Sequence, residues 1–300
     1  MNIIKRMKIT LVLLIVLVQC LPMNKISAQQ YKSSLYKQSS EMADIMIQYE
    51  ADKGSITRFY SSSNRQDANY GYNSPERRQR LLTLIVDYQQ QMSKLDFSAM
   101  EVNGKVDYVL FKRNLEDQAY QLKEEQVKYD QIVKYLPFAD RIAAIEKPRR
   151  RGIAVVGQDA AKELNDINKE ISKSIQSLKK ADSIELNLAD YASTSIKGLQ
   201  NVLKNYFNFY NGYDPLFTWW VPKTYNVTDS LLNTYAVAIR KKGKLVSYQK
   251  DDGSGIIGKP IGREELIRQL KLEFIPYTPE ELVDIANKEF AWCDAELLKA

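Results

Sequence analysis

The adjacent carboxylates Glu264-Glu265 and Glu280-Glu281 are residues of this sequence whose type could support paired acid and base catalysis. Successive residues of an α-helix point about 100° apart, so neither pair can converge on one reacting atom. Thr278-Pro279 precedes the second pair and is typical of a capped helix start, where acidic side chains are favoured by the helix dipole. We therefore assign these carboxylates to helix capping and solvation.

The sequence contains no histidine. Serine hydrolases with a Ser-His-Asp triad, Cys-His peptidases and histidine-ligated zinc sites all require that side chain. A four-carboxylate dimetal bundle also requires it, because its ligand pattern is Glu-x-x-His. The residues present therefore predict no catalytic, cofactor-binding or metal site within this chain.

The two cysteines are Cys20 and Cys293. If Cys20 is removed with a leader peptide, Cys293 is the single thiol left and no internal disulfide can form. Cys293 lies three residues after Phe290 and four before Leu297, on the apolar side of the last predicted helix. Free cysteines commonly pack as small hydrophobic residues, so this position favours a buried structural thiol over a nucleophile.

The N-terminus has the pattern of an export signal. Basic residues precede an apolar run at 9–18, and the small-residue sequence Ile26-Ser27-Ala28 follows it. Residues 17–20, Leu-Val-Gln-Cys, also have the outline of a lipoprotein cleavage box. Cleavage after Ala28 is the favoured outcome; lipidation at Cys20 and a retained anchor are the alternatives. We predict a signal peptide at 1–28 and an exported chain in the periplasm or cell envelope, with membrane attachment only if Cys20 is lipidated.

The composition is that of a globular chain, with 44% hydrophobic and 27% charged residues among 300. Four of the six excess positive charges lie within residues 1–28, which leaves the remainder at +2. A nearly neutral body argues against nucleic acid as a partner. The basic cluster at 147–152 has two interpretations, an anionic or membrane-surface contact and a solvated loop between helices. The second is favoured because no wider basic face surrounds the cluster.

Apolar residues recur at spacings of three and four along most of the chain, which predicts an all-α, multi-helix assembly over residues 29–300. A surface loop is expected at 52–74 and a Gly-rich excursion at 243–262, the latter with room for one short β-hairpin. The expected helices cover 30–51, 75–95, 103–135, 142–145, 157–183, 188–210, 228–242, the stretch after Gly262, and the stretch after Thr278.

Each predicted helix has an apolar stripe that we expect to be buried. The longest regular one is Ala160, Leu164, Ile167, Ile171, Ile175 and Leu178. For the helix at 103–135 the stripe is Val106, Leu110, Leu122, Tyr129, Val133 and Leu136. For the two closing helices the stripes are Leu266, Leu270 and Phe274, and then Leu282, Ile285, Ala286, Phe290, Cys293 and Leu297.

Residues 211–222 form an aromatic segment, in which Trp219 and Trp220 stand side by side between Pro215 and Pro222. The prolines predict that this segment is not regular helix. Its rings could line a cleft, or they could fix a loop to the core. The second interpretation is favoured, because aromatic residues in loops mostly serve packing.

The closing segment reads IGKPIGREEL at 257–266, IPYTPEEL at 275–282 and KEFAWC at 288–293. These sequences resemble the bacterial domain-of-unknown-function family 885. The earlier sequences VDYVL at 106–110 and FTWW at 217–220 fit the same family. The resemblance implies an exported, mainly helical protein of about twice this length, whose second half carries a HExxH zinc motif of gluzincin-like metallopeptidases.

In that motif two histidines bind zinc and the glutamate acts as general base. A chain without histidine can receive none of these roles, so the resemblance implies the N-terminal portion of a zinc-dependent peptidase, inactive alone. Zinc is then expected only with a missing C-terminal half, and the last helix is expected to continue past Ala300. A peptide substrate would contact this portion through Trp219, Trp220, Arg263 and Tyr277. The alternative is a non-enzymatic helical envelope module that binds a peptide or protein partner.

Overall fold

The computed structural model describes residues 40–60, 72–246, 253, 255 and 258–299. Within this part of the chain the structure is all-α, as predicted, with one minimal strand pair. The α-helices are α2 (Ala43–Tyr60), α3 (Pro75–Met92), α4 (Val102–Ile132), α5 (Ala139–Ile145), α6 (Lys147–Arg150), α7 (Gly157–Lys180), α8 (Leu186–Tyr210), α9 (Pro215–Trp220), α10 (Pro222–Lys241), α11 (Arg263–Leu272) and α12 (Pro279–Leu297). Short 3₁₀ turns cover Phe97–Ala99 and Val133–Tyr135.

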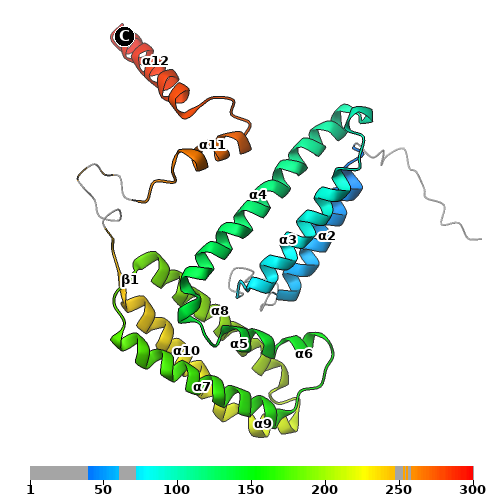
Figure 1. The fold of residues 1–300 in the computed structure, drawn as a ribbon, viewed down its shortest axis with the longest axis vertical. Helices are drawn as coiled ribbons and strands as arrows, with labels where there is room; N and C mark the ends of the chain where they lie inside the picture. The colour runs from blue at the N-terminus through cyan, green and yellow to red at the C-terminus, as the bar shows by residue number, and fades with distance from the viewer. Residues whose placement is uncertain (1–39, 61–71, 247–252, 254, 256–257, 300) are drawn as a thin grey trace, which may run out of the picture. The chain divides into compact units, whose positions relative to one another are not determined.

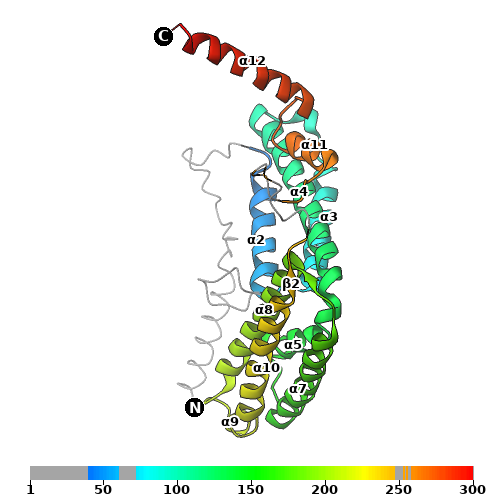
Figure 2. The ribbon, with the colours of Figure 1, turned by 90° about the vertical axis from the view of Figure 1, so that its left-hand side faces the viewer.

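The larger core lies among α5, α7, α8 and α10 (Figure 1). Leu164, Ile167 and Ile171 of α7 are buried there, as the periodicity of 157–183 predicts. The apolar residues that recur at spacings of three and four along α8 are also buried, namely Ala192, Ile196, Leu199, Leu203, Tyr206 and Tyr210. Helix α9 lies at the end of this group, between α8 and α10 (Figure 2). The local apolar pattern therefore predicts the main packing faces of the bundle.

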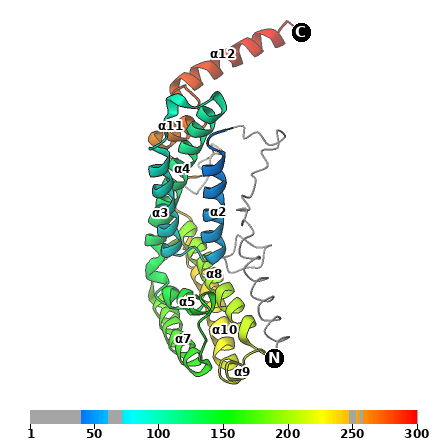
Figure 3. The same ribbon diagram turned by 90° about the vertical axis from the view of Figure 1, so that its right-hand side faces the viewer.

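A second core lies among α2, α3 and the first two thirds of α4 (Figure 3). Tyr49 is its centre and makes edge-to-face contacts with Tyr88 at 5.1 Å and Phe111 at 5.3 Å between ring centroids. Helix α4 contributes to both cores, because Tyr129 and Ile132 belong to the larger one.

The predicted face of α4 is wrong in part. Leu122, Tyr129 and Leu136 are buried, but Val106, Leu110 and Val133 are exposed. Phe111 and Leu115 are buried in their place. A 31-residue helix with apolar residues on several sides has no single apolar face, and the partner helices select which side is covered.

Four of the described helices, α3, α9, α10 and α12, begin with proline at the first helical position. Ser74 caps α3 and accepts a hydrogen bond from the Arg77 N–H. Thr278 and Glu281 form the predicted capping box of α12. The Asp214 side chain caps α9 by accepting a hydrogen bond from the Phe217 N–H. The prediction that 211–222 contains no regular helix is therefore wrong. The prolines begin α9 and α10 and interrupt neither.

Two other helix limits differ from the predictions. Helix α2 continues to Tyr60 through part of the expected loop at 52–74, of which 61–71 lies outside the described residues. Helix α10 begins at Pro222 and includes Thr228, which is buried and donates its hydroxyl to the Thr224 carbonyl at 2.9 Å. A threonine that bonds back within a helix has the same sequence signature as a cap.

The strand pair joins β1 (Ile184–Glu185) to β2 (Gly243–Lys244) in parallel register. It brings the start of α8 next to the end of α10. Most of the expected short hairpin falls at 247–252, 254 and 256–257, which lie outside the described residues. Over 40–60, 72–246 and 258–299, no helix has the length and hydropathy needed to span a bilayer. The predicted signal peptide, Cys20 and the sequence up to residue 39 are also outside the described residues.

Candidate functional site

A cavity of about 320 Å³ lies where the end of α2, the start of α3, α5 and α6 meet, and we call it the α2–α5 pocket. The rings of Phe59, Tyr60 and Tyr72 form part of its wall. Its charged lining residues are Glu76, Asp140, Glu146, Lys147 and Arg150. The size suits a small ligand, so the state of these charges decides what the pocket can do.

Most of those charges are bound within the protein. Lys147 pairs with Glu76, which also accepts a hydrogen bond from the Tyr60 hydroxyl at 2.9 Å. This pairing with Lys147 lowers the pKa of Glu76. Buried Glu146 binds Arg149 at 2.9 Å and Arg150 at 2.8 Å. The Lys147–Glu76 pair therefore joins α6 to α3 across the pocket, whereas the Glu146 pairs lie within one turn at the start of α6. These charges are held by the protein itself, which is typical of a structural junction.

The basic cluster at 147–152 was expected as a solvated loop, and the structure differs. Residues 147–150 form α6, and Arg150 donates to the carbonyls of Arg58 and Phe59 at the end of α2. Arg149 stacks over Phe209 with its guanidinium carbon 4.6 Å from the ring centroid. In this cluster Arg151 is the exposed cation, and each of the remaining cations contacts a neighbouring helix: Lys147 contacts α3, Arg149 contacts α8 and Arg150 contacts α2.

Arg78 of α3 is only 1% exposed. Its guanidinium donates to the Gln126 side chain at 2.8 Å and the Asn73 carbonyl, and it stacks over Tyr129. The hydroxyls of Tyr129 and Tyr72 are 2.6 Å apart, and burial raises the pKa of Tyr72 well above its ordinary range. Sequence analysis did not single out Arg78. Arg78 stands three residues before Leu81, so it lies on the same side of α3 as the buried apolar residues. This spacing could have identified Arg78 as an inward-facing residue.

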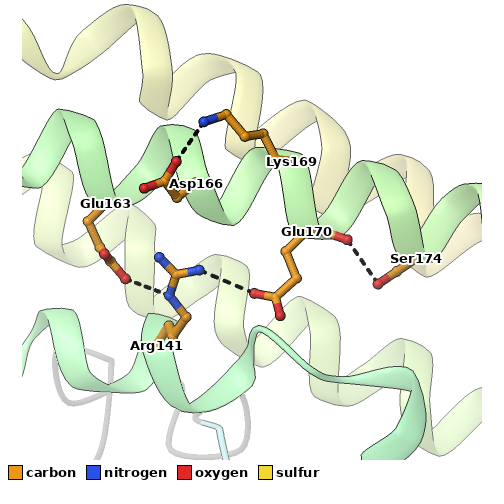
Figure 4. Close-up of polar contacts among 6 residues, drawn as sticks. All are labelled: Arg141, Glu163, Asp166, Lys169, Glu170 and Ser174. Carbon is orange, nitrogen blue, oxygen red and sulfur yellow. Dashed lines mark hydrogen bonds and ion pairs between the residues drawn. The ribbon is translucent and has the colours of Figure 1, made fainter.

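Arg141 of α5 points toward two carboxylates of α7 (Figure 4). It binds Glu163 at 2.8 Å and Glu170 at 3.4 Å, and the hydrogen bond to Glu163 raises the pKa of Arg141. Asp166, on the same helix, binds Lys169 at 2.7 Å. Glu163 and Glu170 thus link α7 to α5, whereas the Asp166 pair stays within α7. The described residues contain no group of three or more His, Cys, Asp or Glu able to hold a metal ion.

The four residues proposed for a substrate cleft fall into two groups. Trp219 and Trp220 belong to α9, whereas Arg263 begins α11 and Tyr277 lies between α11 and α12. Arg263 pairs with Glu280 at 2.9 Å, and both side chains are exposed. Among the described residues no hydrogen bond or ring contact joins the tryptophans to Arg263 or Tyr277. The structure does not bring the two groups into one cleft.

Helix α9 is fixed by Phe217 and not by its tryptophans. Phe217 is fully buried, with ring centroids 5.4 Å from Tyr206 and 5.1 Å from Tyr210. Trp219 is 80% exposed and Trp220 is 44% exposed. The expectation that large rings fix this segment to the core holds for one ring, while both indoles face solvent.

Helix α11 contacts α4 mainly through polar groups. Arg268 binds Asp117 of α4 at 2.7 Å and Glu265 at 2.7 Å, and its guanidinium carbon lies 4.0 Å from the Tyr120 ring centroid. Arg113 of α4 donates to the Leu272 carbonyl. The predicted burial of Leu266 and Phe274 is wrong, and Leu270 is only half-buried. Charged side chains with long aliphatic stems cover this contact in place of an apolar stripe.

No residue of α12 is buried. Phe290 is 69% exposed and Leu297 is 74% exposed, and Cys293 is also exposed. The predicted buried stripe and the predicted buried thiol are therefore wrong for this chain. The periodicity correctly indicates an amphipathic helix, but it carries no information about what covers the apolar face.

The Arg268 cluster predicts an acid-sensitive contact. Hydrogen bonds from Arg268 and Tyr120 lower the pKa of Glu265 from 4.5 to about 2. A lowered pKa stabilises the folded state above pH 4.5, and this contribution is lost as the pH falls towards 2. We expect hydrogen exchange of α11 amides to accelerate over that interval. The Arg268→Gln variant should show fast α11 exchange already at neutral pH, whereas Arg263→Gln, which removes an exposed pair, should behave like the parent.

Comparison with protein-family models, with characterised proteins and with solved structures finds no match to this chain.

Proposed function

We propose that residues 29–300 form the non-catalytic helical portion of an exported zinc-dependent peptidase, and that the zinc-bearing portion of that peptidase packs against α12. The proposal combines the resemblance of 257–293 with the surface properties of that same segment. Peptide would be the substrate of the whole protein. In this proposal the described helices supply support and position for the zinc-bearing portion, and no residue of this chain takes a chemical step.

The observation that supports the proposal best is the uncovered apolar stripe of α12. Leu282, Phe290 and Leu297 lie within one side of the helix, and the last two are largely exposed. Exposed apolar surface of this extent commonly marks a contact with another folded part. The capping box shows that α12 has its own well-defined start, so its exposed side is a regular helical surface.

The residues present do not fit a zinc ion. The chain has no histidine. Aspartate and glutamate can also ligate zinc, but the described residues contain no group of three or more His, Cys, Asp or Glu side chains placed to hold a metal ion. Accordingly, we assign no ligand, general base or nucleophile within this chain.

The purified chain tests this assignment. We expect no stoichiometric zinc by elemental analysis and no hydrolysis of a mixed peptide library, with or without added zinc. One zinc per chain would contradict the absence of a metal site. The alternative, a non-enzymatic envelope module, predicts tight binding of an intact peptide or protein by this chain alone, which the peptidase proposal does not require.

A further inference from the structure

Six exposed apolar residues gather at one end of the larger bundle, and we call them the aromatic tip. They come from the segment before α7 and from the segment that includes α9. Each is between 44% and 82% exposed. The aromatic tip consists of Ile153, Val156, Tyr213, Leu216, Trp219 and Trp220.

The two segments of the aromatic tip are held together by a close backbone contact. A Cβ atom at Gly157 would lie 2.7 Å from the Leu216 carbonyl oxygen and 2.8 Å from the Phe217 Cα. The absence of a side chain at Gly157 therefore allows the start of α7 to lie directly against α9. Ile153 and Val156 precede this contact, and Leu216 belongs to it, so the exposed groups form one surface.

The exposed rings stand on an ordered support. Phe217 is buried beneath them, and Asp214 accepts the Phe217 N–H at 2.9 Å as the helix cap. The Thr218 hydroxyl donates to the Asp214 carbonyl at 2.7 Å and accepts the Gly212 N–H at 2.8 Å. This local network fixes α9, so the indoles are presented outward by a defined helix.

The chemistry of the aromatic tip fits the interface of a lipid bilayer. Tryptophan and tyrosine favour the headgroup level because each combines a large apolar ring with a polar edge. Of the nearby charges, Arg151 and Lys223 are exposed cations. Glu146 is buried against two arginines and Asp214 is engaged as a cap, which leaves Asp159 as the exposed carboxylate at the start of α7. The cationic excess is small, so the rings are the main source of attraction.

A peptide partner is less well matched to this surface. Bound peptides commonly occupy a groove or extend a sheet edge. None of the four cavities described for this chain is lined by a residue of the aromatic tip. A fluid headgroup layer can surround projecting rings without a groove.

We propose that the aromatic tip binds the surface of an anionic lipid bilayer, with the indoles of Trp219 and Trp220 entering the headgroup region. This contact does not depend on the proposed peptidase function, because it uses a surface that is complete within the chain. It also differs from lipidation at Cys20, because it requires no covalent anchor.

Vesicle binding tests the proposal, with every variant carrying Cys20→Ser to remove lipidation. The probes are vesicles of phosphatidylcholine alone and of phosphatidylcholine mixed with phosphatidylglycerol. We expect the parent to co-sediment with the mixed vesicles and the Trp219→Ala/Trp220→Ala variant to bind at least about tenfold more weakly. Trp292→Ala, which removes an indole that is 61% exposed on α12, is the matched control and should bind like the parent. Arg151→Gln/Lys223→Gln should weaken binding to the mixed vesicles only.

A second readout needs no change in the aromatic tip. In Trp292→Phe the remaining tryptophans are Trp219 and Trp220, and their emission should shift to shorter wavelength when mixed vesicles are added. An unchanged emission, or equal co-sedimentation of the parent and the double alanine variant, would overturn the proposal. Capture of a soluble protein through the aromatic tip, with no vesicle binding, would also overturn it and assign the surface to a protein partner.

Discussion

Replacing Phe217 by alanine is expected to lower the free energy of unfolding by about 3–5 kcal/mol. The Phe217 ring is fully buried and contacts Tyr206 and Tyr210 of α8, with Phe207 at 6.3 Å between centroids. Its loss removes the one apolar anchor of a six-residue helix, which is too short to be stable by itself. Chemical denaturation followed by far-ultraviolet circular dichroism measures the change.

Trp219→Ala is the matched control for this effect. It removes a larger ring from the same helix, but that ring is 80% exposed. We expect a change within about 0.5 kcal/mol, as for most surface substitutions. Equal losses for Phe217→Ala and Trp219→Ala would mean that the indole is part of the core and that the aromatic tip is not a free surface.

Gly157→Ala is expected to destabilise the protein by about 1–3 kcal/mol. The added methyl group would lie 2.7–2.8 Å from three backbone atoms of Leu216 and Phe217. Backbone atoms cannot move aside as a side chain can, so α7 and α9 would have to separate. Thermal and chemical unfolding of the variant should both show the loss.

Gly54→Ala is the control with the opposite sign. Gly54 lies inside α2, and the closest atom to an added Cβ is the Arg58 Nη1 at 3.1 Å, at the end of a flexible side chain. Alanine is favoured over glycine within a helix by about 0.8–1 kcal/mol, so this variant should gain stability. A loss at Gly54 and none at Gly157 would contradict the close contact between α7 and α9.

The sequence predicts helices well where one apolar stripe faces one core. Ile167 of α7 and Ile196 of α8 are both fully buried as their spacing indicates. Capped starts are also predictable, because Ser74 and Thr278 satisfy backbone donors within their own turn. Both kinds of signal depend on residues only a few positions apart, which is why local patterns contain them.

Features that depend on distant residues were missed. Arg268 binds Asp117 across 151 positions, and no local pattern indicates that α11 would use charged groups to contact α4. The local sequence does not predict α9, because Pro215 and Pro222 suggest that no helix crosses this segment. Each proline instead stands at the first position of a helix. The stripe of α12 was identified correctly as a face, but whether it is covered depends on a neighbour that local sequence does not specify.

The candidate site also combines features that the local sequence predicts with features that depend on distant residues. The charged cluster at 147–151 was visible in the sequence, but its pairing with Glu76 and Glu146 depends on how α3 and α6 pack. Trp219 and Trp220 were selected by residue type, and the structure explains their exposure by the buried ring of Phe217 between α8 and α9. Charged and aromatic residues can be selected from the sequence, whereas the residues that they contact can be identified only from the three-dimensional fold.

We propose that this chain is the helical portion of a zinc-dependent peptidase, and sequencing the gene beyond codon 300 tests this proposal. We expect an open reading frame that continues and encodes a HExxH motif on a helix, with both histidines available for zinc. A stop codon immediately after the codon for Ala300 would contradict the claim for this gene product.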